Sequence, residues 1–150
     1  MRRWVTGVSI VTSQSEGYRH GMTVNSFVSI SIEPPLVAVT LAVNTRTHSL
    51  VKECGYFGVS ILSSSQSELS DIFAGRILDG GDRFAGVESY TWLGKAPLIE
   101  GGLAGLECRV VHEYPMPNST LFVGEVLAAG RREEGDPLVY VDRGYHALQK

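Results

Sequence analysis

Two strand-like runs separated by a pair of prolines constrain this chain more than any other feature of its 150 residues. The run from Met22 to Ile32 alternates, so its small polar side chains and its larger side chains fall on opposite faces of an extended strand. Pro34 and Pro35 then interrupt the chain, because proline cannot donate a backbone hydrogen bond to a sheet. The run 36–43 is almost wholly apolar and predicts a buried strand.

The two faces of the first run lead to different expectations. We expect one face to pack in a core, and it consists of Val24, Ser26, Val28, Ile30 and Ile32. The opposite face is polar apart from one phenylalanine, and it consists of Thr23, Asn25, Phe27, Ser29 and Ser31. Such a polar stripe either faces water or contacts a ligand, since hydroxyl and amide groups can hydrogen-bond a phosphate or the edge of a heterocycle.

A second group of polar side chains follows the buried strand, and it consists of Asn44, Thr45, Arg46, Thr47, His48 and Ser49. Apolar residues at helical spacing predict a short helix over 46–54 that ends at Gly55. We expect Thr47 or Ser49 to cap the N-terminus of this helix. Its free N–H groups would then suit an anionic group such as a phosphate, although capping alone also explains hydroxyls at this place.

The remaining chain predicts many short strands and a second short helix over 66–74, with Ser65 as its N-cap. Seven to nine strands are expected, and with so few helices they favour a barrel closed on itself over a parallel sheet. The loop 76–86 is polar and rich in glycine. It contains Arg83, which either pairs with Asp82 at the surface or contacts a ligand.

Several classes of protein are disfavoured by composition and motifs. The net charge of −3 gives no basic surface for nucleic acid, and no run approaches the ~18 apolar residues that span a bilayer. The two cysteines are far apart, so we expect neither a metal site nor a disulfide framework, and we expect a reduced, cytoplasmic protein. Hydrolase, zinc-protease and Rossmann motifs are lacking, so any redox activity needs a bound organic cofactor.

The segment GMTVNSFVSISIEPPLV at 21–37 closely resembles the strand pair of the short-chain flavin reductases. The resemblance continues in FGVSILS at 57–63, FAG at 73–75, DRF at 82–84, LFVGEV at 121–126 and PLVYVDRGYHAL at 137–148. It implies one domain over 1–150 with a mainly β, Greek-key split barrel and two or three short helices. It also implies a homodimer that uses NAD(P)H to reduce FMN, or FAD, and supplies reduced flavin to a partner monooxygenase.

The same resemblance implies a set of flavin contacts, without any catalytic side chain or metal ligand. The ring edge would meet Thr23, Val24, Asn25 and Ser26, with Ser31 deeper on the same face. The ribityl chain and phosphate would meet Asn44, Thr45, Thr47, His48 and Ser49. Arg83 would reach the flavin from its loop, and Tyr145 or His146 from the C-terminal end.

The chain departs from the family pattern just before the segment LFVGEV. Family members often carry Gly-Asp-His there, and its histidine is associated with nicotinamide binding. This chain has Pro117-Asn118-Ser119 instead. Either Asn118 and Ser119 hydrogen-bond the nicotinamide amide, or His146 takes the place of the missing imidazole, or another donor reduces the flavin. The alternative function is an FMN-binding electron carrier or flavin-storage protein that does not oxidise NAD(P)H itself.

Overall fold

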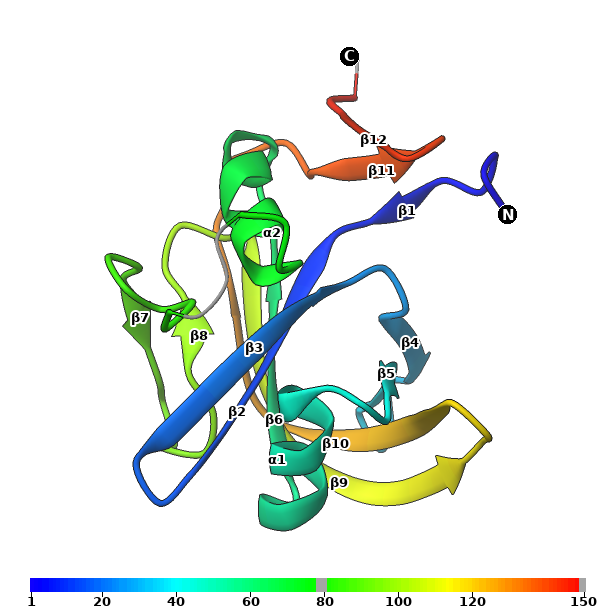
Figure 1. Ribbon diagram of the computed structural model, residues 1–150, viewed down its shortest axis with the longest axis vertical. Coiled ribbons are helices and arrows are strands. Elements are labelled where there is room, and N and C mark those ends of the chain that lie inside the picture. Colours follow the sequence, from blue (N-terminus) through cyan, green and yellow to red (C-terminus); the bar gives the residue numbers. More distant parts are fainter. Residues whose placement is uncertain (78–80, 149–150) are drawn as a thin grey trace.

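A single seven-stranded antiparallel sheet dominates the computed structural model, which describes residues 1–77 and 81–148 (Figure 1). Its strand order is β3-β2-β6-β9-β10-β5-β4. The strands are β2 (Ser9–Ser15), β3 (Tyr18–Val24), β4 (Val28–Ser31), β5 (Leu36–Ala42), β6 (Tyr56–Ile61), β9 (Ala104–Pro115) and β10 (Ser119–Arg131).

Smaller elements cover the ends of this sheet. One three-stranded sheet has the order β1-β11-β12 and joins both ends of the chain, and β7 pairs with β8. Their bounds are β1 (Thr6–Gly7), β7 (Ser89–Tyr90), β8 (Leu98–Ile99), β11 (Val139–Val141) and β12 (Gly144–His146). The helices are α1 (Arg46–Cys54) and α2 (Ser67–Phe73), with the 3₁₀ turn η1 (Ser64–Gln66) directly before α2.

The seven-stranded sheet curls so that its first edge, at β3, comes close to β5. The segment 25–27 links β3 to β4, and in it the Ser26 hydroxyl donates to the carbonyl of Thr40 at 2.9 Å and accepts from its N–H at 3.2 Å. Val24 on β3 and Val37 on β5 belong to the same buried cluster. The barrel is therefore closed here by side chains and not by a backbone ladder.

Two hydrophobic clusters fill the molecule. The larger one lies inside the curled sheet, where Val51 of α1 packs with Phe57 and Phe122. The smaller one lies under α2 and the three-stranded sheet and is built around Phe73, Phe84 and neighbouring aliphatic side chains. Each helix thus buries its apolar side on the sheet, with α1 and α2 both packed against β3 (Figure 1).

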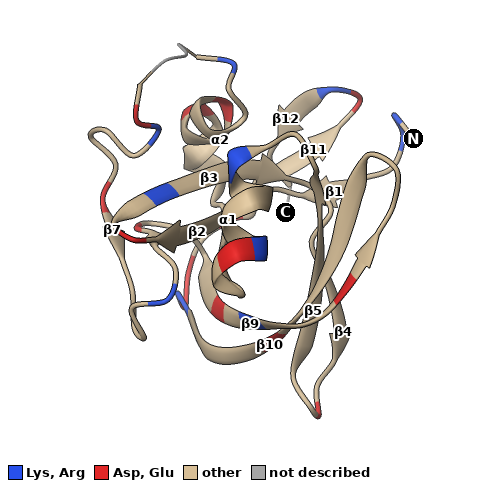
Figure 2. Cartoon of the chain, turned by 60° about the horizontal axis from the view of Figure 1, so that its bottom comes forward, with Lys and Arg blue, Asp and Glu red and all other residues tan. Residues whose placement is uncertain are grey.

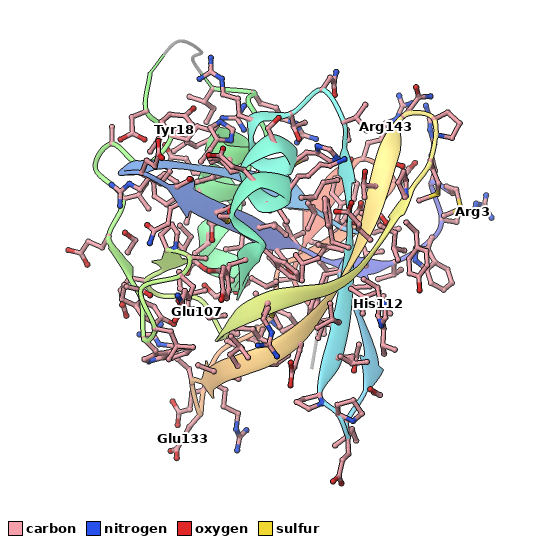
Figure 3. All side chains as sticks on the ribbon, turned by 90° about the horizontal axis from the view of Figure 1, so that it is seen from below. Arg3, Tyr18, Glu107, His112, Glu133 and Arg143 are labelled. Carbon is pink, nitrogen blue, oxygen red and sulfur yellow. The ribbon has the colours of Figure 1, made fainter. Side chains whose placement is uncertain are left out.

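A buried carboxylate on β9 organises the segment that carries β7 and β8. Glu107, labelled in Figure 3, is completely buried. Its oxygens accept bonds at 2.7 to 3.2 Å from the Thr91 hydroxyl and from the backbone N–H groups of Trp92, Leu93, Lys95 and Ala96. Burial alone would raise the pKa of Glu107, but these donors together lower it below the usual value of glutamate. The carboxylate is therefore held ionised as a structural anchor.

The prediction of one continuous strand over 22–32 is wrong. The chain leaves the sheet at Asn25, because the Ser26 side chain satisfies the backbone of Thr40, and it re-enters as β4 on the other side of β5. The expected core face is also wrong beyond this break. Val28, Ile30 and Ile32 are 52%, 48% and 91% exposed, since β4 is an edge strand.

The expected helix caps also need correction. Thr45, and neither Thr47 nor Ser49, caps α1, because its hydroxyl accepts the N–H of His48 at 3.3 Å. Gly55 ends the helix as predicted, with φ 75°. Before α2 the chain forms η1, so Ser65 lies within that turn and is not the N-cap. The described residues contain twelve strands, more than the seven to nine expected, because several are only two or three residues long.

Candidate functional site

A groove follows the outer side of β3 and consists of three adjoining hollows. The central chamber has a volume of about 530 Å³, the hairpin chamber about 380 Å³ and the C-terminal chamber about 240 Å³. The central chamber shares His20, Arg46, Gly81 and Arg83 with the hairpin chamber. It shares Thr23 and Ala74 with the C-terminal chamber. The three hollows therefore adjoin one another along the strand.

The central chamber lies between β3, the start of α1 and the end of α2. Its lining residues are His20, Met22, Thr23, Asn44, Thr45, Arg46, Phe73, Ala74, Gly81 and Arg83. Gly21 makes this arrangement possible, because a Cβ at that position would lie 2.9 Å from the Phe73 ring. The Thr23 hydroxyl donates to the carbonyl of Ser70 at 2.6 Å and so ties β3 to α2.

Positive charge gathers around the central chamber. Arg46 and Arg83 both line it, and the two ion pairs identified among residues 1–77 and 81–148 involve neither of them. The first turn of α1 begins at the chamber wall, and the first N–H groups of a helix have no acceptor within the helix. Figure 2 shows basic positions on β3, near the start of α1 and on the loop after α2 on the same side of the molecule. The chamber therefore suits an anionic group.

His20 adds a neutral hydrogen-bonding group to this wall. Its Nδ1 lies 2.8 Å from the hydroxyl of the fully buried Thr47. Burial, followed by the positive charges of Arg83 and Arg46, lowers the pKa of His20 to about 4, against a smaller opposing effect of Asp82. The imidazole is thus uncharged at neutral pH, and the positive charge of the chamber comes from the two arginines.

The position of Arg83 matches neither of its two sequence expectations fully, which were a surface pair with Asp82 and a ligand contact. Its Nη1 donates to the carbonyls of Gly21 and Phe73 at 3.1 and 3.0 Å, so the side chain joins β3 to the end of α2. Asp82, the expected surface partner, instead accepts the N–H of Phe84 at 2.9 Å. Arg83 therefore has a structural role and still lines the chamber where a ligand contact was expected.

The C-terminal chamber is bounded by a network around Tyr145. The phenol donates to Asp71 at 3.0 Å and lies 2.8 Å from the Ser70 hydroxyl. Arg76 pairs with the same carboxylate at 2.9 Å. Burial and the bond to Asp71 raise the pKa of Tyr145, while the Ser70 bond opposes this shift. The phenol is therefore neutral and fixed, with its ring 5.7 Å from that of Tyr140.

Seven of the sequence-predicted residues line this groove. Thr23, Asn44, Thr45 and Arg83 line the central chamber, and Val24, Asn25, Tyr145 and again Thr23 line the C-terminal chamber. Asn25 also lines a separate hollow of about 500 Å³ beside Trp4 and Val28, as does Ser26. The hydroxyl of Ser26 is already used by Thr40.

The other predicted residues lie outside the linings of these chambers. The Ser31 hydroxyl donates to the carbonyl of Pro34 at 2.5 Å in the β4–β5 turn. The His48 side chain faces inward, and its Nε2 lies 2.8 Å from the Thr120 hydroxyl. Burial and then Lys52 lower the pKa of His48, with Glu113 opposing. Thr47 is buried against His20, while Ser49 and His146 are exposed on α1 and β12. Their contacts with a flavin stay predictions.

Asn118 and Ser119 lie at the tip of the β9–β10 hairpin. The carbonyl of Asn118 accepts the N–H of Val43 at 3.1 Å, and Val43 directly precedes Asn44 in the chamber wall. The hairpin tip thus adjoins the groove without lining it. Their contact with nicotinamide stays a prediction.

Sequence reasoning missed several residues of the groove. Arg46 was noted within the polar group but was not assigned a flavin contact, and Met22, Phe73, Ala74, Arg76 and Tyr140 were not assigned to the site. His20, which lines the central chamber from β3, was not among the predicted contacts either. The one local signal was the position of Arg46 directly after Thr45, since a basic residue beside a helix N-terminus adds to an anion site.

Comparison with known proteins now defines the class to which the fold and groove belong. The model of the flavin reductase like domain matches residues 1–149. This chain therefore belongs to the flavin reductase-like family, which confirms the resemblance seen in the sequence. Solved structures of flavin reductases share the split-barrel fold, which confirms the expected architecture.

Individual relatives carry several names. The actinorhodin polyketide dimerase of Streptomyces coelicolor is 38% identical over 149 residues, which are 99% of this chain and 82% of the relative. The reductase component of 4-hydroxyphenylacetate 3-monooxygenase from Thermus thermophilus is 34% identical over 148 residues, covering 99% and 92%. The structure of the Streptomyces globisporus NADH:FAD oxidoreductase SgcE6 superposes with a TM-score of 0.91 at 31% identity, covering 99% and 89%. Other relatives are named NADH-dependent flavin or FMN reductases.

The groove fits the chemistry of a flavin nucleotide. A volume of about 530 Å³ lies within the range of small-ligand pockets, and the cationic end offers donors for a phosphate. Thr23 on β3 and Asn25 directly after this strand add polar groups. Among the described residues, no cluster of His, Cys, Asp and Glu could hold a metal ion. None of the helices described here is long and apolar enough to cross a membrane.

Proposed function

We propose that this chain is an NAD(P)H-dependent flavin reductase that reduces FMN and supplies the reduced flavin to a partner monooxygenase. One observation carries the proposal: the groove along β3 brings Arg46, Arg83 and the N-terminus of α1 together at one end of a cavity of flavin-nucleotide size. Membership in the family supports it, as do the relatives named as NADH-dependent flavin reductases. FAD remains a second candidate substrate, in line with the name of the SgcE6 oxidoreductase.

The residues of this chain bind and orient, and the bound flavin supplies the hydride-accepting ring. The N–H groups at the start of α1 and the two guanidinium groups hold the phosphate. Thr23, which lines both the central and the C-terminal chamber, and Asn25, which lines the C-terminal chamber, hydrogen-bond the ring edge. Phe73 and Ala74 of the α2 end supply apolar surface that excludes water from one side of the groove.

The nicotinamide contact is assigned to Asn118 and Ser119, in place of the family's Gly-Asp-His. Support comes from the hairpin tip, whose Asn118 carbonyl is bonded to the chain next to the groove wall. His146 is a weaker substitute, because its side chain is exposed on β12 and outside the chamber linings. An electron carrier without NAD(P)H oxidation stays the second candidate function, because Pro117-Asn118-Ser119 contains no imidazole where the family pattern has a histidine.

We also propose that the protein is a homodimer that acts in the cytoplasm. The support for a dimer is an apolar surface around the edge strand β4, where Trp4, Val28, Ile30 and Ile32 are 67%, 52%, 48% and 91% exposed. A reduced compartment agrees with the free thiols of Cys54 and Cys108.

Light scattering coupled to gel filtration tests the dimer, and Ile30→Lys is expected to shift the wild-type dimer to a monomer. A wild-type monomer would refute it.

The reductase activity is tested by anaerobic spectroscopy. FMN is added to the purified protein, followed by NADH or NADPH, and the visible flavin band is recorded with time. Rapid, repeated bleaching that depends on the protein is the expected result. Flavin binding without bleaching would favour the carrier. A protein that binds no flavin would contradict both functions.

A further inference from the structure

The hairpin chamber lies beyond the cationic end of the proposed flavin groove and has no role in the function described so far. It is lined by Gly17, Tyr18, Arg19, His20, Arg46, Gly81, Asp82 and Arg83. Because four of these residues also line the central chamber, the groove does not stop where the flavin phosphate is expected. A ligand that extends past this phosphate therefore meets a further hollow of about 380 Å³.

An exposed aromatic ring lines this chamber. Tyr18 begins β3 next to the β2–β3 turn and is 47% exposed, and Figure 3 labels it at that end of the molecule. Its hydroxyl accepts a long hydrogen bond of 3.5 Å from Nη1 of Arg46. A half-exposed aromatic ring next to a guanidinium offers a stacking surface for a nucleobase, because every base presents a flat π face.

The charges around the chamber favour a polyanionic ligand. Three guanidinium groups line it, and none belongs to the ion pairs identified in the described parts of the chain. Arg19 is held over the Phe84 ring at 4.4 Å and donates to Ser89 at 3.1 Å, so its charge is fixed in place. Asp82 contributes a negative charge to the same lining, and its carboxylate accepts the N–H of Phe84. Among the lining residues that the structure describes, the surplus of charge is positive, and His20 adds none because it is neutral.

We infer that the hairpin chamber binds the adenosine diphosphate part of a dinucleotide, with the adenine on Tyr18 and the phosphates at Arg46. This inference rests on the proposed flavin site in the central chamber. Two ligands of this reaction carry that group: FAD as the flavin substrate, and the nicotinamide nucleotide as the hydride donor. Both share an adenine and a diphosphate, so the chamber chemistry is the same, and binding experiments identify the source.

The experiment measures the affinities of FMN, FAD and ADP by fluorescence and calorimetric titration, and the KM of NADH at saturating FMN. The variants are Tyr18→Ala, which removes the ring, Tyr18→Phe, which keeps it, and Tyr114→Ala. Tyr114 is the matched control, because it is a 55% exposed tyrosine on β9 that lines none of the chambers. ADP is expected to bind the wild type and to compete with the dinucleotide.

Tyr18→Ala is expected to weaken ADP binding by roughly 5- to 150-fold, which corresponds to the loss of one base–aromatic stack. FMN affinity should stay unchanged, and Tyr18→Phe and Tyr114→Ala should resemble the wild type. A matching loss for FAD identifies the flavin as the source, whereas an unchanged FAD affinity with a raised KM of NADH identifies the nicotinamide nucleotide.

Two outcomes overturn the inference while leaving the flavin site intact. In the first, FMN binds normally and Tyr18→Ala changes neither FAD affinity nor the KM of NADH. In the second, Tyr18→Phe loses as much affinity as Tyr18→Ala, so the aromatic ring is not the binding surface. If the wild type binds no FMN at all, the proposed function fails, and this inference fails with it.

Discussion

Replacing Arg46 by glutamine tests how the groove recognises the flavin phosphate. Arg46 lines the central chamber beside the start of α1, and no carboxylate in the described residues forms an ion pair with it. A hydrogen bond to a charged group contributes about 1.5–3 kcal/mol, which corresponds to roughly 10- to 150-fold in affinity. We expect Arg46→Gln to weaken FMN by this factor and to leave riboflavin, which has no phosphate, unchanged.

In the assay, each flavin is titrated with protein at two salt concentrations, and binding is measured by the quenching of flavin fluorescence. The loss for FMN should shrink at high salt, because salt screens exposed charges. Arg109→Gln is the matched control, since Arg109 pairs with Glu125 at 2.5 Å and lines none of the three chambers. Equal losses for FMN and riboflavin, or no loss for FMN, would refute the phosphate assignment.

Three further changes test the site and the scaffold. Asn25→Ala should weaken FMN about five-fold through one lost hydrogen bond of ~1 kcal/mol, and titration showing full affinity would remove Asn25 from the site. Gly21→Ala should lower stability by about 1–3 kcal/mol in urea unfolding, because the new Cβ would press on Phe73; an unchanged midpoint would contradict this packing. Glu107→Gln should lower the free energy of unfolding by about 3 kcal/mol at pH 7 and by less in acid. The reason is that the pKa of Glu107 is lower in the folded state, so the ionised carboxylate stabilises the wild type above the unfolded-state pKa, and this stability disappears as the pH falls through the folded-state pKa. A difference between variant and wild type that does not depend on pH would refute the ionised anchor.

Local sequence patterns predicted the elements whose causes are local. The apolar run 36–43 became β5, and helical spacing placed α1 at Arg46–Cys54 with Gly55 at its end. These features depend on neighbouring residues, so one sequence is enough to predict them.

Long-range pairing decided the features that the sequence alone did not predict. His48 was assigned to the phosphate cluster, but its ring contacts Thr120, which is 72 residues away in the chain. Thr47 is likewise turned toward His20 on β3. The break at Ser26 depends on the backbone of Thr40 in another strand. None of these partners leaves a local pattern, because hydroxyl and imidazole groups suit a ligand and a buried hydrogen bond equally well.

A crystal structure of the protein with FMN tests the central claim most directly, because it shows where the flavin binds. The account predicts the phosphate at the start of α1, within hydrogen-bond distance of Arg46, and the ring along β3 beside Thr23 and Asn25. An FMN bound outside the groove would contradict the account, as would an FMN whose phosphate points toward Tyr145 in the C-terminal chamber.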